Sequence, residues 1–238
     1  MVVVLCSCFF FSFGCTNKED MIQTATLQFM EQLAANNNRP WFEQHKDEYL
    51  ALKENFEALV TEVLQGLGEV EPTFRELNAK DCIMRIYRDV RFSKDKSPYK
   101  VNLGAGFSNG GRKFTGAGYY LHIEPGKSFI GGGIWMPDGP ILKAIRQEID
   151  YGFNDFLAII AHKHFKKLYK TIDGEKLVKL PKGYTEDNPA LEYLKLKSFT
   201  VSTPLTDAEL TKKGLAKKIT ESFVTMKPFV DFLNRTVA

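Results

Sequence analysis

Apolar residues in the first third of the chain recur every three or four positions, the spacing that places them on one face of a helix. Residues 22–33 follow this spacing and predict a short helix that ends at a run of asparagines closing with Asn38. Asn38 is a favourable N-cap, and Pro40 suits the first turn of a second helix. An apolar stripe from Phe42 to Val63 continues that helix, which we expect to end near Gly66.

The middle of the chain changes to shorter segments rich in β-branched and aromatic residues, which predict strands. The strands are expected at residues 82–92, 101–107, 119–124, 129–135 and 198–202. A basic loop separates the first two, and a glycine-rich connection leads to the third. Because Pro125–Ser128 reads as a tight turn, the third and fourth strands are expected to form a hairpin.

Helical spacing returns after the fourth predicted strand. The expected helices are residues 141–151, 154–169, 190–194 and 206–233. Thr206 is the expected cap of the last one, and Gly214 and Pro228 are expected to interrupt it. Because successive strands do not alternate with helices, the order predicts an α+β fold. We expect a single domain with a mainly antiparallel sheet of about five strands, flanked by N-terminal and C-terminal helices.

Composition fits a globular protein and excludes disordered and fibrous classes. The 238 residues are 44% apolar and 26% charged. The net charge of +3 is too small to indicate a nucleic-acid or membrane partner by itself. Of the four cysteines, Cys82 alone follows Met21, so that part of the chain is not expected to form an internal disulfide.

The first twenty residues form a leader outside the expected domain, which spans residues 21–238. Residues 2–13 are apolar but too short for a transmembrane helix, and no basic residue precedes them. One interpretation is a mistaken start upstream of Met21, which makes the protein cytoplasmic. The alternative is a weak lipoprotein signal, in which Gly14 and Cys15 resemble a lipobox and Cys15 anchors the protein to a membrane.

The densest cluster of charge lies at residues 85–100, which carry six basic and two acidic side chains. The candidate ligand-binding residues are Arg85, Arg88, Arg91, Lys94, Lys96 and Lys100. Strand alternation would place Arg88 among apolar neighbours, so Arg88 needs a carboxylate or ligand partner. Arginine suits bidentate recognition of phosphate or carboxylate. A solvated basic edge and loop is the competing interpretation.

Three residues are candidates for proton transfer: Asp89, Tyr99 and His122, with Tyr87 as a further orienting group. His122 is expected to share a strand face with Tyr120 and Glu124, where it could be a general acid or base or a hydrogen-bonded structural histidine.

A second basic group consists of Lys182, Lys195 and Lys197 with Tyr184, and it could meet the first group across the sheet or remain on the surface. The glycine triplet Gly131–Gly133 is either packing room for a large side chain or the floor of a ligand site. No zinc, nucleophile or dinucleotide motif is complete, so we expect neither a metal nor a cofactor.

The basic segment, RIYRDVRFSKDKSPYK, occurs with NNNRPWF upstream and GGGIWMPDGPILKAIRQEI, PKGY and LKLKSF downstream. With these motifs the chain resembles a microbial family, domain-of-unknown-function family twenty-four sixty-one, from about Thr24 to Leu233. The resemblance implies one full-length domain of intracellular type that begins near Met21. It implies no particular activity.

The favoured function is binding, and in some form turnover, of a small phosphate- or carboxylate-bearing ligand at the basic segment. Whether the protein is an enzyme stays open. One alternative is a nucleic-acid binder that uses the same surface, with Tyr87, Phe92 and Tyr99 as stacking platforms. The other is an interaction module whose basic loop docks an acidic protein.

Overall fold

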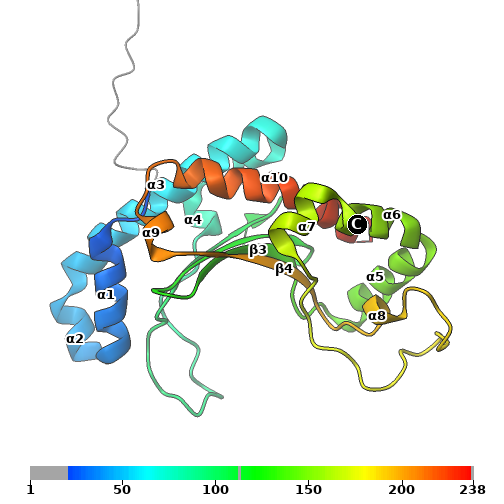
Figure 1. The fold of residues 1–238 in the computed structure, drawn as a ribbon. Helices are drawn as coiled ribbons and strands as arrows, with labels where there is room; N and C mark the ends of the chain where they lie inside the picture. The colour runs from blue at the N-terminus through cyan, green and yellow to red at the C-terminus, as the bar shows by residue number, and fades with distance from the viewer. Residues whose placement is uncertain (1–20, 112–113, 237–238) are drawn as a thin grey trace, which may run out of the picture.

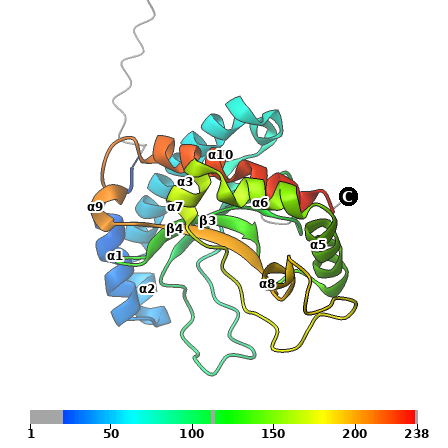
Figure 2. The same ribbon diagram turned by 45° about the vertical axis from the view of Figure 1, so that its right-hand side comes forward.

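The computed structural model describes residues 21–111 and 114–236 and contains one four-stranded sheet in the order β1-β2-β3-β4. Every neighbouring pair of strands is antiparallel. The sheet forms an arch (Figure 1), with α3 and α10 lying across its upper face. The lower face is left open by the described part of the chain, and Figure 2 shows the same arrangement after a turn. The fold is therefore α+β, as expected.

The order of elements is helices, strands, helices, with a late return to the sheet. The strands are β1 (Leu103–Phe107), β2 (Gly118–Ile123), β3 (Ser128–Ile134) and β4 (Phe199–Leu205). The helices before the sheet are α1 (Thr24–Ala35), α2 (Arg39–Gln44), α3 (Lys46–Val70), the 3-10 turn η1 (Pro72–Glu76) and α4 (Ala79–Cys82). The later helices are α5 (Gly139–Tyr151), α6 (Phe153–Ala161), α7 (Lys163–Tyr169), α8 (Leu191–Leu194), α9 (Asp207–Leu210) and α10 (Leu215–Asn234).

The core lies between the upper face of the sheet and the helices. Side chains alternate across a strand, so every second residue of each strand points to this face. The covered residues include Leu121, Ile130 and Val201, each at most 1% exposed. Helix α10 packs on β2 and β3 and contributes Phe223 and Met226, both fully buried. The described residues thus share one continuous hydrophobic core, as expected of a single domain.

Three helix predictions need correction. The single helix expected at residues 154–169 is divided at His162 into α6 and α7. The second predicted helix is broken at His45, whose ring stacks on Trp41 and whose Nδ1 lies 2.8 Å from the Trp41 carbonyl oxygen. The His45 side chain shares the Trp41 carbonyl with the His45 N–H, which also donates to it over 3.2 Å. Pro228, in contrast, does not interrupt α10, because its neighbours Phe229 and Val230 are buried and hold the helix against the core.

The sheet has four strands because the expected first strand, residues 82–92, is not one. Only Ile83 bridges the edge strand, opposite Ala105, and the Met84 N–H donates to the Gly104 carbonyl over 2.9 Å. Beyond this point the chain leaves the sheet as a loop that returns at β1. Within the loop, Tyr87 forms a single antiparallel bridge with Tyr99. At the loop's tip, aspartate side chains accept from backbone N–H groups and Lys96 donates to the Val90 carbonyl, in place of a longer ladder.

Gly132 tests how tightly the covered face is packed. A Cβ at this position would lie 2.4 Å from the Met226 sulfur and 2.6 Å from the Gly118 carbonyl oxygen. We expect Gly132→Ala to lower the free energy of unfolding by about 3 kcal/mol, measured by urea denaturation. Gly139→Ala is the matched control, because a Cβ there meets nothing within 4 Å. Equal stability of the two variants would contradict this packing.

Candidate functional site

The lower face of the sheet is hollowed into a pocket of about 500 Å³. Its lining comes from all four strands and from the glycine-rich connection between β1 and β2. The larger lining side chains are Met84, Phe114, Tyr120, Phe129 and Trp135. Ligand sites in proteins are typically concave, mostly apolar and of this volume range, so the hollow is the candidate functional site.

The hollow exists because several residues on the open face are glycines, which have no side chain. Strand register places Gly106, Tyr120, Gly131 and Ser202 in one row across the open face, and Gly118, Gly133 and Thr200 in the next. The glycine triplet contributes to both faces of the sheet. Gly132 gives Met226 room on the covered face, whereas Gly131 and Gly133 line the hollow.

A row of polar side chains follows β2 along one side of the hollow. His122 Nε2 lies 3.0 Å from Glu124 Oε2, and His122 Nδ1 lies 3.3 Å from the Tyr120 hydroxyl and 3.4 Å from Asn102 Nδ2. The His122 ring also stacks on Phe129, with 4.7 Å between ring centroids. These contacts confirm that His122 shares a face with Tyr120 and Glu124.

The partners of His122 decide which of its nitrogens carries the proton. Asn102 offers an amide donor to Nδ1, so Nδ1 is the acceptor and Nε2 donates to Glu124. Burial would raise the pKa of Glu124, but hydrogen bonds from His122 and Lys127 outweigh burial and keep that pKa below its ordinary value. Burial raises the pKa of Tyr120, which therefore remains a hydroxyl donor at neutral pH. His122 thus presents a basic nitrogen toward a tyrosine that lines the hollow.

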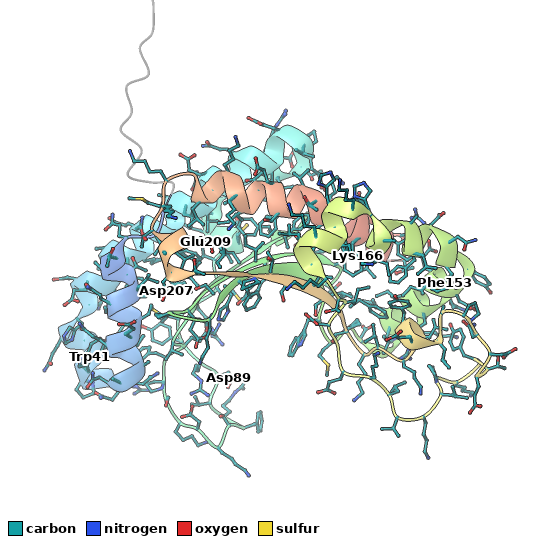
Figure 3. All side chains as sticks on the ribbon, in the orientation of Figure 1. Trp41, Asp89, Phe153, Lys166, Asp207 and Glu209 are labelled. Atoms are coloured by element: carbon teal, nitrogen blue, oxygen red, sulfur yellow. The ribbon has the colours of Figure 1, made fainter. Side chains whose placement is uncertain are left out.

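The basic loop, residues 85–100, projects below the sheet, as the position of Asp89 shows (Figure 3). Its base is fixed by Tyr99, which is 3% exposed and stacks on Phe42 of α2 with 4.0 Å between ring centroids. The side-chain amide of Asn37 donates to the Tyr99 carbonyl over 3.0 Å and accepts from the Tyr99 N–H over 3.1 Å. Tyr99 is therefore an anchor of the loop, away from the open face.

Two of the three candidate arginines are paired inside the loop. Arg88 donates to a carboxylate oxygen of Asp95, which confirms that Arg88 has a carboxylate or ligand partner. Arg91 makes two hydrogen bonds to Asp89, over 3.0 and 2.7 Å. Local aspartates therefore neutralise two of the three candidate arginines.

The remaining candidate cations differ in their surroundings. Lys96 donates to the Val90 carbonyl over 3.0 Å. Among the described residues, Arg85, Lys94 and Lys100 have neither an ion pair nor a side-chain hydrogen bond. Burial, together with the nearby charge of Arg85, lowers the pKa of Lys100. A bound anion would offset the repulsion between Arg85 and Lys100 and would stabilise the charged form of the partly buried Lys100, which makes these two the cations best prepared for one.

The second basic group lies on the other flank of the open face, in and beside the loop of residues 170–190 (Figures 1 and 2). Lys197 pairs with Glu175 over 3.0 Å, whereas Lys182 is exposed and Tyr184 and Lys195 are half-buried. The two basic groups therefore face each other across the hollow without merging into one cluster.

Sequence reasoning missed the place of Trp135 in this site and two unusual residues outside its lining, Met136 and Arg146. Trp135 is 79% exposed at the edge of the hollow, directly before Met136, whose φ of 48° is unusual for a residue with a side chain. The GGGIWM motif is the signal that could have identified both. Arg146 of α5 donates to the Leu196 carbonyl over 3.0 Å, while its buried Nε has no hydrogen-bond partner within the described structure. No sequence pattern singles out Arg146.

Other expectations can be compared with the described residues only. Within residues 21–111 and 114–236, no cluster of three or more histidine, cysteine or acidic side chains could hold a metal ion. The helices in those same ranges are all too short or too polar to cross a membrane. The proposed leader and its Cys15 lie outside the described residues.

The pairing of Asp95 predicts how the basic loop responds to acid. Hydrogen bonds from the Ser97 hydroxyl, the Ser97 N–H and Arg88 lower the pKa of Asp95 from 3.8 to about 2. Because the pKa of Asp95 is lower in the folded protein than in the unfolded chain, ionised Asp95 stabilises the folded state. This stabilisation is complete above pH 3.8 and is lost as the pH falls through 2. A carbon-13 NMR titration should give a midpoint near 2 for wild type and a higher midpoint for Ser97→Ala, with Ser93→Ala unchanged. A wild-type midpoint near 3.8 would contradict the pairing.

Comparison with known proteins assigns the chain to a family and to no described activity. No curated protein and no solved structure matches the chain. The profile of a family described as "Conserved hypothetical protein (DUF2461)" matches residues 25–232, most of the chain, so the protein belongs to that family.

Proposed function

We propose that the protein binds a small phosphate- or carboxylate-bearing molecule in the hollow on the open face of its sheet. The observation that carries this proposal is the hollow of about 500 Å³ with the Tyr120–His122–Glu124 row along its side. Both parts are needed, because an apolar pocket supplies contact area and a few polar groups supply orientation.

The body of the ligand would lie against the floor of the hollow. Gly106, Gly131 and Gly133 leave the strand backbone accessible, and Phe129 and Trp135 provide aromatic surfaces beside it. A flat, partly apolar molecule uses such a site best, because it contacts both the backbone and the rings.

The anionic group would lie at the edge nearest the basic loop. Met84 lines the hollow and Arg85 follows it directly, while Lys100 lies two residues before Asn102, whose amide reaches His122. The proposal therefore assigns the anion to Arg85 and Lys100, with Lys94 as a more distant cation. The other candidate cations have an indirect role in the proposal, because their hydrogen bonds hold the conformation of the loop; they are Arg88, Arg91 and Lys96.

His122 supports proton transfer if the bound molecule is also transformed. Its Nδ1 accepts from Tyr120, and Glu124 holds the ring through Nε2. Such a pair can receive a proton from the ligand through Tyr120 and stabilise the resulting imidazolium. Tyr99 is buried and Asp89 is paired with Arg91, so neither takes part in the proposed chemistry.

Trp135 provides a direct test of binding. We expect at least one compound from a panel of phosphate, sugar phosphates, nucleoside monophosphates and dicarboxylates to change the intrinsic fluorescence of the wild-type protein. This change in fluorescence on adding the compound should vanish in Trp135→Phe and persist in Trp41→Phe. The reason is that Trp135 alone of the two tryptophans lines the hollow. Arg85→Ala should weaken binding about tenfold, whereas Lys143→Ala, an exposed cation of α5, should leave it unchanged.

Gly106→Val tests whether the ligand binds in the hollow or on the surface around it. The nearest atom to a Cβ at Gly106 is the Met84 Cε at 3.8 Å, an ordinary van der Waals contact, so the position accepts a Cβ and the valine methyl groups extend into the hollow. We expect this variant to fold and to lose binding. Full binding by Gly106→Val, or no response to any compound of the panel, would contradict the proposal. Binding of nucleic acid that falls steeply with salt and survives Gly106→Val would favour the nucleic-acid alternative.

A further inference from the structure

Two separate loops expose large apolar side chains that nothing in the described structure covers. Phe92, in the basic loop, is 96% exposed, and its ring contact is the Arg91 guanidinium at 5.9 Å. Val178, in the loop of residues 170–190, is 95% exposed, and nearby Leu180 is 38% exposed. Each exposed side chain is unfavourable in water, so their occurrence at both loops calls for a common explanation.

Lysines accompany these apolar side chains in both loops. Lys94 and Lys96 follow Phe92, and the nearby Asp95 is already paired with Arg88. Residues 176–182, KLVKLPK, contain three lysines and no acidic residue. Within this segment Lys179 and Lys182 are exposed and, among the described residues, have no ion-pair partner. Each loop therefore combines positive charge with one or two apolar side chains.

The loops project from the same side of the molecule. In Figure 1 the basic loop and the yellow loop of residues 170–190 both extend below the open face of the sheet, one on each flank. Figure 2 shows the same direction for both after a turn of 45°. A single flat surface placed below the sheet could therefore contact both loops.

We propose that these two loops dock the protein on the surface of a membrane that contains anionic lipids. Charge complementarity selects this partner, because lysines beside a bilayer are attracted to anionic headgroups while apolar side chains enter the boundary with the acyl chains. A bilayer also accepts two separate points of insertion, whereas a protein partner would need one continuous patch spanning both flanks of the hollow. The open face of the sheet would then face the lipid surface.

Sedimentation with vesicles tests this proposal. The full-length protein should sediment with vesicles of phosphatidylcholine and phosphatidylglycerol at low salt, and not with phosphatidylcholine alone. The double variant Phe92→Ala, Val178→Ala should bind about tenfold more weakly, because its insertion contacts are lost. Tyr151→Ala is the control for an exposed apolar side chain, being 85% exposed at the end of α5.

The contribution of charge has its own control. Lys94→Glu combined with Lys179→Glu should weaken vesicle binding about tenfold or more. Lys166→Glu should not, because Lys166 lies on α7 on the helical side of the sheet (Figure 3). Thermal melts of each variant verify folding, and all four altered loop residues are exposed.

Two outcomes would overturn the membrane proposal. One is failure to bind anionic vesicles at low salt. The other is binding that Lys94→Glu, Lys179→Glu abolishes but Phe92→Ala, Val178→Ala leaves unchanged, which would indicate attraction to polyanions in general. Gly106→Val places a side chain in the hollow and changes no residue of either loop. Vesicle binding that this variant keeps while it loses the small ligand therefore separates the membrane proposal from ligand binding.

Discussion

The alternation of side chains across a sheet that is covered on one face only is the constraint on which the rest of this structure depends. On the covered face each strand contributes large apolar residues, and α3 and α10 bury them. On the open face three of the four strands place glycine at positions that would otherwise carry side chains. The same strands therefore build a dense core on one side and a hollow on the other.

The basic loop depends on a contact between distant parts of the sequence. Asn37 and Phe42 come from the NNNRPWF motif. The Asn37 side chain makes two hydrogen bonds with the Tyr99 backbone, and the Phe42 ring stacks on the Tyr99 ring. Inside the loop, the pairs Arg88–Asp95 and Arg91–Asp89 brace the chain. Much of the charge that makes this segment conspicuous therefore shapes the loop, and fewer cations remain available to a partner.

Local signals predicted the fold well where short-range chemistry decides the conformation. Asn38 caps α2 by accepting from the Trp41 N–H over 3.0 Å, and Thr206 caps α9 in a reciprocal capping box with Glu209. The β2–β3 hairpin follows from its proline-glycine turn. The expected strand at residues 82–92 failed because alternation cannot reveal that β1 begins only at Leu103. Within the described residues, the segment pairs with the sheet at Ile83 alone, and further on Tyr87 bridges Tyr99 within the loop.

The candidate site was predictable in its residue types and only partly in its geometry. Strand alternation correctly placed His122 beside Tyr120 and Glu124, two residues away on either side. Sequence alone could not show that Asp89 and Asp95 form ion pairs with two of the arginines, because ion pairs within a loop depend on how its backbone turns. Nor could it place Gly106 of β1 and Trp135, which directly follows β3, in the lining of one hollow.

The central claim is that the open face of the sheet, and not the tip of the basic loop, receives a small anionic ligand. The most direct measurement is a nitrogen-15 NMR spectrum of the protein with and without a compound that binds. The account predicts shifts at the Gly131 amide, the Trp135 indole and the His122 ring, with Nδ1 unprotonated in the free protein. Shifts confined to residues 91–96, with the Gly131 and His122 signals unchanged, would contradict it.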